Sequence, residues 1–199
     1  SYSNTAGVYI STNYGVNWTQ TSLNNITVLA MAVNGNNIYA GTEHGVYCSS
    51  NNGASWSFLG IAYKVVHSLL VVNSNIFAGV DYWNNTDFHD KLDVAGGVFT
   101  SNNNGTSWSY IGLQNSITWA FATVGNNIYA GIDYIYPNAG TSGVYVYDVG
   151  TNWTQLGLNY EWVYALTVSG NVFFAGSSAE NYPTLGTGGV HISTNNGSS

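Results

Sequence analysis

The sequence predicts an all-β protein built from about four copies of one antiparallel, four-stranded unit. The first observation is a segment that begins with Gly-Val and ends at a Trp, which recurs at residues 7–18, 45–56, 97–108 and, one residue shorter, 143–153. The second is an aromatic-Ala-Gly triplet whose Gly follows each of these Trp residues by 23 positions, at Gly41, Gly79, Gly131 and Gly176. A repeat of roughly 40 residues with many short strands is typical of a β-propeller blade.

Within each unit the pattern indicates four strands. The first is a hydrophobic run that we expect to be buried on both faces, at residues 26–33, 65–72, 117–124 and 162–168. A turn rich in Asn, Gly and Ser leads into the strand of the triplet, because these residues tolerate the positive φ of a tight hairpin. The third strand begins at Gly-Val and the fourth at the Trp. Only the connection between the second and third strands varies in length.

We expect one domain over residues 1–199, with repeat units at 7–44, 45–96, 97–142 and 143–188 and a partial unit at 189–199. The predicted strands number 17: two from a first unit, twelve from three full units and three from a last one. A ring of four four-stranded blades takes 16 strands, and one of five takes 20. The sequence therefore predicts an incomplete propeller, either part of a longer array or a protomer that shares strands with neighbouring copies in a ring or fibre.

The turn between the third and fourth strands resembles a known motif. Residues 11–18, 49–56 and 101–108 are similar to the Asp-box, Ser-x-Asp-x-Gly-x-Thr-Trp, of bacterial-neuraminidase-type (BNR) repeats. In that family the box forms this turn of a propeller blade. Here Asn stands in place of the box Asp, and an acid remains only at Asp148 in the irregular copy. Because Asn can also bond the turn backbone, we expect the turn to form, with its Trp as a packing residue.

The charge of the chain excludes several functions. The net charge is −7, the only basic side chains of the Lys/Arg type are Lys64 and Lys91, and there is no arginine. Binding to nucleic acid through phosphates, or to anionic lipid, needs a basic density that this chain lacks. The resemblance implies an arginine triad for sialidases, which Lys cannot replace, so sialidase activity is excluded as well. Cys48 is alone and forms no internal disulfide.

The acidic residues are predicted to gather on one face of the propeller. Alternate connections of an up-and-down sheet emerge on opposite edges, so the box turns occupy one face and the variable connections the other. Eight of the nine acids fall on the variable face, and only Asp148 lies on the box face. Loops on one side of a rigid scaffold are a common place for function. We expect ligand binding there by Asp81, Tyr82, Trp83, Asp133, Tyr134, Tyr136, Glu161, Glu180 and Tyr182.

These features favour a non-enzymatic extracellular or cell-surface protein that binds carbohydrate or builds a surface structure. Its expected partners are carbohydrate or further copies of itself, and no cofactor is expected. The alternative is a glycoside hydrolase of the Asp-box propeller type, in which two of the acids would form the catalytic pair. An assay for both retention and cleavage of glycans separates the two.

Two weaker signals remain. A loop dense in ionisable groups could hold a cation, although Lys91 within it opposes one; its candidate ligands are Asp87, His89, Asp90 and Asp93. Six sequons occur, about as many as this composition gives by chance, so they permit N-glycosylation without indicating it. They lie at Asn17, Asn25, Asn84, Asn104, Asn152 and Asn196.

Overall fold

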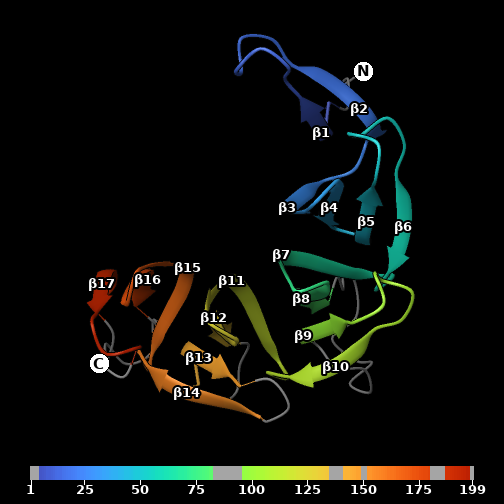
Figure 1. Cartoon of the computed structure of the whole chain (residues 1–199). Helices are drawn as coiled ribbons and strands as arrows, with labels where there is room; N and C mark the ends of the chain where they lie inside the picture. Colours follow the sequence, from blue (N-terminus) through green and yellow to red (C-terminus); the bar gives the residue numbers. More distant parts are fainter. Residues whose placement is uncertain (1–4, 83–95, 135–140, 149–151, 180–186, 198–199) are drawn as a thin grey trace. The chain divides into compact units, whose positions relative to one another are not determined.

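The computed structural model of the chain describes residues 5–82, 96–134, 141–148, 152–179 and 187–197. In this part every regular element is a β-strand, and all strand pairs are antiparallel (Figure 1). No helix long and apolar enough to span a membrane occurs among these residues. The chain divides into two compact units, one of residues 1–78 and 100–109 and the other of residues 79–99 and 110–199.

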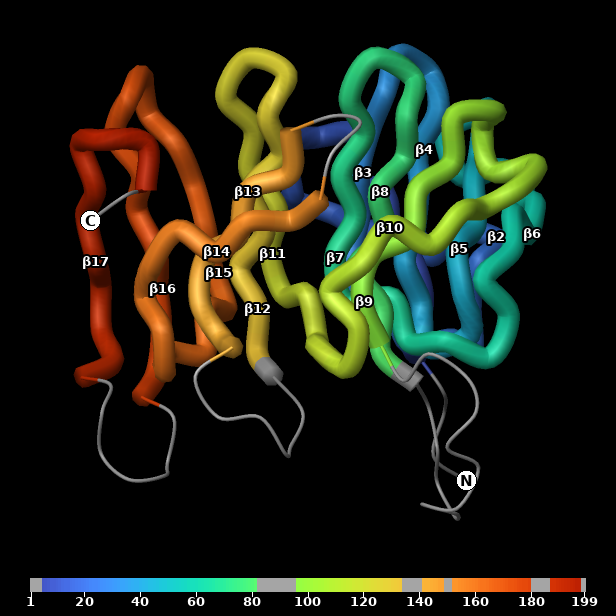
Figure 2. Tube along the Cα trace, turned by 90° about the horizontal axis from the view of Figure 1, so that it is seen from below, coloured from blue at the N-terminus to red at the C-terminus, as the bar shows by residue number. Residues whose placement is uncertain are grey.

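The strands form five sheets, and in each sheet the strand order follows the chain (Figure 2). The first sheet has two strands, β1 (Gly7–Ile10) and β2 (Thr19–Asn24). The second has four: β3 (Val28–Asn34), β4 (Asn37–Thr42), β5 (Gly45–Ser49) and β6 (Ser57–Gly60). The third also has four, which are divided between the two units: β7 (Lys64–Val72), β8 (Asn75–Tyr82), β9 (Gly96–Ser101) and β10 (Ser109–Gly112).

The last two sheets lie in the second unit. The fourth sheet has four strands: β11 (Ser116–Val124), β12 (Asn127–Tyr134), β13 (Gly143–Tyr147) and β14 (Trp153–Gly157). The fifth has three: β15 (Glu161–Ser169), β16 (Val172–Ala179) and β17 (Gly189–Ser193). The predicted all-β array of four-stranded units is confirmed, with three complete sheets and a partial sheet at each end.

Two features of the first strand of each unit differ from the prediction. The register shifts at the same repeat position in three sheets, between Val28 and Ala30 and at the matching places in β11 and β15. The expectation that this strand is buried on both faces is wrong for β3, whose Leu29, Met31 and Val33 are 45%, 51% and 66% exposed. Side chains alternate between the two faces of a strand, and the other set in β3, Val28, Ala30 and Ala32, is partly buried.

The core is built by packing one sheet against the next. Val8 of β1 packs with Ile26 and Ala40, and Val144 of β13 packs with Val163 and Ala175 of the following sheet. This contact explains the Gly of the triplet. A Cβ added at Gly131 would lie 2.6 Å from Val163 Cγ1, and one at Gly41 would lie 2.7 Å from Val66 Cγ1. Only Gly allows the sheets to approach this closely.

The box turns share one hydrogen-bond pattern. Ser101 Oγ donates to Asn103 Oδ1 at 2.9 Å and accepts from the amides of Asn103 at 3.4 Å and Gly105 at 2.8 Å. Asn103 Oδ1 also accepts from the amide of Ser107 at 2.9 Å. Matching bonds to the serine hydroxyl recur in the turns that begin at Ser11, Ser49 and Ser193. The prediction that Asn bonds the turn backbone in place of Asp is confirmed.

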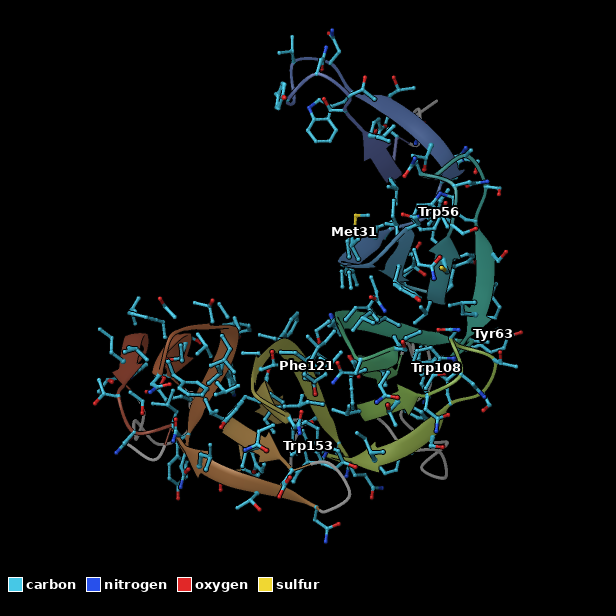
Figure 3. The ribbon with its side chains drawn as sticks, viewed as in Figure 1. Met31, Trp56, Tyr63, Trp108, Phe121 and Trp153 are labelled. Atoms are coloured by element: carbon cyan, nitrogen blue, oxygen red, sulfur yellow. The ribbon has the colours of Figure 1, made fainter. Side chains whose placement is uncertain are left out.

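The Trp of a box packs on the fourth strand of the preceding sheet (Figure 3). Trp108 Nε1 donates to the carbonyl oxygen of Leu59 at 2.9 Å, and Trp56 Nε1 donates to Thr21 Oγ1 at 3.3 Å. Trp153 lies against Gly112, where an added Cβ would be 2.9 Å from Trp153 Cδ1. The predicted packing role is confirmed for these three residues. Trp18, in the first sheet, is 62% exposed.

Candidate functional site

Three of the acids that the sequence places on the face of the variable connections occupy the same position in the repeat. Glu43, Asp81 and Asp133 each lie two residues after the Gly of the aromatic-Ala-Gly triplet, where the second strand ends. The residue before each acid is buried: Thr42, Val80 and Ile132 are 0%, 0% and 2% exposed. Because side chains alternate along a strand, a buried neighbour directs the acid to the opposite face. The repeat thus presents one carboxylate at the same edge of three successive sheets.

Glu43 shows what this position does in the first unit. Its side-chain Oε1 accepts from the amide of Thr27 at 3.2 Å, and its own amide donates to the carbonyl oxygen of Thr27 at 3.2 Å. His44 Nε2 lies 4.0 Å from the same carboxylate oxygen, and the His44 side chain is 59% exposed. One oxygen of Glu43 is therefore tied to the strand edge beside an exposed imidazole.

Asp81 and Asp133 are the members of the predicted ligand site that the structure describes at this position. Both are half-buried and are the second-last residues of β8 and β12, followed by Tyr82 and Tyr134, the final residues of those strands. The two residues belong to different sheets, and each makes at least one polar or electrostatic interaction within the chain. The motif Gly-x-Asp-Tyr, present in both copies, would have shown their equivalence from the sequence.

Several predicted residues lie outside the described part of the chain, and their predictions stay predictions. They are Trp83, Tyr136, Glu180 and Tyr182 of the ligand site, Asp87, His89, Asp90 and Asp93 of the candidate cation loop, and Asn84 of the sequons. The other five sequon asparagines are exposed at the surface: Asn17, Asn25, Asn104, Asn152 and Asn196. Among the described residues no group of three or more His, Cys, Asp or Glu side chains is arranged to hold a metal ion.

Glu161 differs from the other predicted acids because it is only 4% exposed. Its Oε2 accepts from Ser177 Oγ at 2.8 Å and from the amide of Gly188 at 3.1 Å. Its Oε1 accepts from the amide of Thr187 at 2.6 Å and from the same Gly188 amide at 3.1 Å. Ser177 Oγ also lies 3.0 Å from His191 Nε2. The chain's own donors thus surround this carboxylate and tie the start of β15 to the segment that leads into β17.

The hydrogen bonds decide the ionisation of Glu161. Burial alone would raise the pKa of this carboxyl group. The hydrogen bonds from Ser177, Gly188 and Thr187, with a smaller effect of the charge on His191, outweigh burial and lower the pKa below its ordinary value. Glu161 is therefore held as an anion. The prediction that it binds a ligand is untested, and binding would compete with these bonds.

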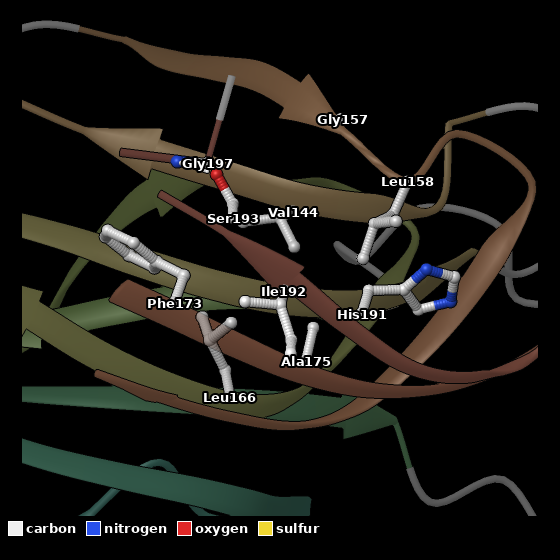
Figure 4. A pocket seen from close by; sticks show the side chains of 10 residues that line it. All are labelled: Val144, Gly157, Leu158, Leu166, Phe173, Ala175, His191, Ile192, Ser193 and Gly197. Atoms are coloured by element: carbon white, nitrogen blue, oxygen red, sulfur yellow. Dashed lines mark hydrogen bonds between the residues drawn. The ribbon is translucent and has the colours of Figure 1, made fainter. Parts of the chain in front are cut away.

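An apolar cavity of about 120 Å³ lies in the second unit, between the fourth and fifth sheets (Figure 4). Its walls include Val144 of β13, Gly157 of β14, Leu166 of β15, Phe173 of β16 and Ile192 of β17. The sequence predicts no site here, because these residues have the pattern of ordinary strand residues. The position of Gly157 in the repeat could have identified the cavity, since its equivalents Gly60 and Gly112 each contact a box Trp.

No known protein-family model matches the chain, and no curated protein matches it. Similar solved structures are β-propeller proteins. An ancestral GH74 enzyme matches with a TM-score of 0.66 and 27% identity over 89% of this chain and 25% of its own. The GH74 enzyme of Niastella koreensis matches with a TM-score of 0.64 and 17% identity, over 96% of this chain and 34% of its own.

A third similar structure is the extracellular domain of a putative one-component system of B. thetaiotaomicron, BT4673. It matches with a TM-score of 0.67 and 16% identity, over 94% of this chain and 25% of its own. The chain thus spans about a quarter to a third of the length of these three proteins. The likeness establishes a propeller-type fold and leaves the activity open.

Proposed function

We propose that this chain is an extracellular propeller module of the Asp-box type that binds carbohydrate without cleaving it. The observation that carries the proposal is the repeated acid at the end of the second strand, at Glu43, Asp81 and Asp133. A sugar presents hydroxyl donors to carboxylate oxygens and apolar ring faces to aromatic side chains. In two of the three copies a Tyr follows the acid, so the repeat supplies both kinds of group.

The alternative is a glycoside hydrolase, which the likeness to two GH74 enzymes favours. Such an enzyme needs one carboxyl group with a raised pKa as general acid and a second carboxylate nearby. Glu161, the most buried acid among the described residues, has a lowered pKa and its oxygens accept hydrogen bonds from the chain. This environment is the opposite of what a general acid requires, so Glu161 is no candidate for that role.

A glycan panel scored for both retention and cleavage tests the proposal. We expect retention of a subset of glycans and no cleavage products. Asp133→Asn should weaken binding about tenfold, in keeping with loss of a charge-assisted hydrogen bond. Asp148→Asn is the matched control, because Asp148 follows β13 on the box-turn edge, and it should bind as the wild type does. Cleavage that is abolished by Asp81→Asn or Asp133→Asn would establish the hydrolase instead.

A further inference from the structure

The dipeptide Asn-Gly occurs four times in the chain, each time at a turn. It lies at residues 34–35, between β3 and β4, and in three of the box turns at residues 52–53, 104–105 and 196–197. All four asparagines are exposed. Asn is labile in this dipeptide, because Gly has no Cβ to keep its amide nitrogen away from the side-chain carbonyl carbon of the Asn. The four copies share this local reactivity, and their surroundings distinguish them.

In the box turns a hydrogen bond holds the glycine amide. Each glycine donates to the serine that opens its box: Gly53 to Ser49 Oγ at 2.8 Å, Gly105 to Ser101 Oγ at 2.8 Å and Gly197 to Ser193 Oγ at 3.0 Å. The glycine nitrogen must lose its hydrogen before it can bond to the Asn side chain. A hydroxyl that accepts this hydrogen therefore opposes the reaction, because the bond has to break first.

The box glycines are also packed against the preceding sheet. An added Cβ would lie 2.8 Å from Thr21 Cγ2 at Gly53 and 2.7 Å from Leu59 Cδ1 at Gly105. At Gly197 it would lie 3.1 Å from Leu156 Cδ1. Ring closure between an Asn side chain and the next nitrogen requires the backbone to turn at this point. Close packing of the glycine resists that movement.

The turn at Asn34 has neither restraint. Strand β3 ends at Asn34 and β4 begins at Asn37, so Gly35 and Asn36 form a two-residue turn (Figure 2). The strand ladder pairs Asn34 with Asn37, and the Gly35 amide lies outside that pair. Among the described residues, nothing lies within 4 Å of a Cβ added at Gly35. This glycine is therefore neither held by a serine hydroxyl nor packed against a neighbouring sheet.

We propose that Asn34 deamidates spontaneously in the folded protein, and that the box turns protect Asn52, Asn104 and Asn196 from the same reaction. The deprotonated nitrogen of Gly35 attacks Cγ of Asn34. A C–N bond forms there, and the side-chain nitrogen leaves as ammonia, which gives a succinimide. Water then opens the succinimide at one of its two carbonyl carbons. The product at position 34 is aspartate or isoaspartate, in which the main chain continues through the side-chain carbon atoms.

Both products change the β3–β4 hairpin. Each adds one negative charge to a chain whose net charge is −7. Isoaspartate also adds one carbon atom to the main chain, at the residue that pairs with Asn37. The extra atom displaces the backbone groups of this last ladder pair, so the end of the hairpin loosens. The inference goes beyond glycan binding, because it uses other residues and is tested without a glycan.

Peptide mapping by mass spectrometry tests the inference on the full chain. The folded protein is kept at mildly alkaline pH in water enriched in oxygen-18, so each conversion replaces the side-chain nitrogen by labelled oxygen and is scored at its own position. The box asparagines should convert at least about tenfold more slowly than Asn34, in keeping with the loss of a buried hydrogen bond before reaction. In concentrated urea the turns are unfolded, and all four sites should convert at similar rates.

Two variants separate the local causes. Asn34→Ser should remove the fast conversion, and the hairpin should still form, because Ser169 and Gly170 occupy the same places between β15 and β16. Ser101→Ala removes the acceptor of the Gly105 amide, so it should speed conversion of Asn104 and leave that of Asn52 unchanged. Circular dichroism confirms that each variant is folded.

The comparison of the folded and urea-treated wild type decides the inference even if Ser101→Ala does not fold. Box asparagines that convert as fast as Asn34 in the folded protein overturn it, because the serine bond and the packing would then give no protection. Slow conversion of Asn34 in the folded protein, at the rate of the box asparagines, also overturns it. That result would show that the strand ladder protects Asn34 as well as the box protects its asparagines.

Discussion

At the scale of single residues, the serine that opens each box is responsible for the turn. Ser101 is 2% exposed, and its hydroxyl donates one hydrogen bond and accepts two. Replacing it by Ala leaves the amide of Gly105 buried without its partner. We expect Ser101→Ala to lower the free energy of unfolding by about 1–3 kcal/mol, the usual penalty for an orphaned buried polar group. Urea denaturation measures this loss.

The neighbouring residue provides the control for that prediction. Asn102 lies in the same turn and is exposed, so Asn102→Ala should change the free energy of unfolding by no more than about 0.5 kcal/mol. Equal destabilisation by both substitutions would mean that the turn responds to any change of polarity, and that the Ser101 hydroxyl has no special part in it.

Single residues also show which contacts can be predicted from the sequence and which cannot. The bonding of Asn in the box could be predicted, because donor and acceptors lie within seven residues of one another. The burial of Glu161 could not, because its donors Ser177, Thr187 and Gly188 are 16 to 27 positions away and become neighbours only when β15 to β17 assemble. Contacts that depend on tertiary structure have no signature in a local pattern.

At the scale of elements, the Glu161 carboxylate accepts hydrogen bonds from Thr187 and Gly188 and so fixes the segment that leads into β17. This set of bonds is called the Glu161 clasp below. Its folded-state pKa is lowered from the ordinary 4.5, so the ionised form is favoured by folding. The stabilisation is therefore present above the ordinary pKa and is lost as the pH falls through the folded-state value. We expect the amides of Thr187 and Gly188 to exchange hydrogen faster, relative to their intrinsic rates, in acid below about pH 4.

Two variants separate the clasp from general acid unfolding. Glu161→Gln removes the titrating group and should abolish this pH dependence while leaving faster exchange at every pH. Glu43→Gln changes a carboxylate that bonds Thr27 in a different sheet, so it should leave the exchange of Gly188 unchanged. A loss of Gly188 amide protection in acid that Glu161→Gln shows to the same extent as the wild type would contradict the assignment.

The strands themselves were largely predictable because the repeat shows each element four times. The strand of the aromatic-Ala-Gly triplet and the third strand beginning at Gly-Val both appear where the pattern placed them. The register shift between Thr118 and Ala120 was not predictable, because a bulge leaves the hydrophobic pattern of a nearly continuous apolar strand unchanged. The exposure of Met31 was missed for a related reason: an apolar residue reads as buried whether or not a neighbouring sheet covers it.

At the scale of the whole molecule, the two triplet glycines Gly131 and Gly176 differ in how closely the chain packs on them. A Cβ added at Gly176 would meet only Ala165 Cβ, at 3.6 Å, an ordinary contact. At the equivalent Gly131, an added Cβ would lie 2.6 Å from Val163 Cγ1 and 2.9 Å from its carbonyl oxygen.

The two glycines should therefore respond differently to the same substitution. Gly131→Ala overpacks a contact within the chain and should destabilise the dilute protein by about 1–3 kcal/mol. Gly176→Ala should change the free energy of unfolding by no more than about 0.5 kcal/mol, because the added methyl group makes only an ordinary contact with Ala165 Cβ. Thermal melting of the two variants measures both effects. Equal destabilisation by both substitutions would show that the close approach of Val163 to Gly131 does not determine the loss.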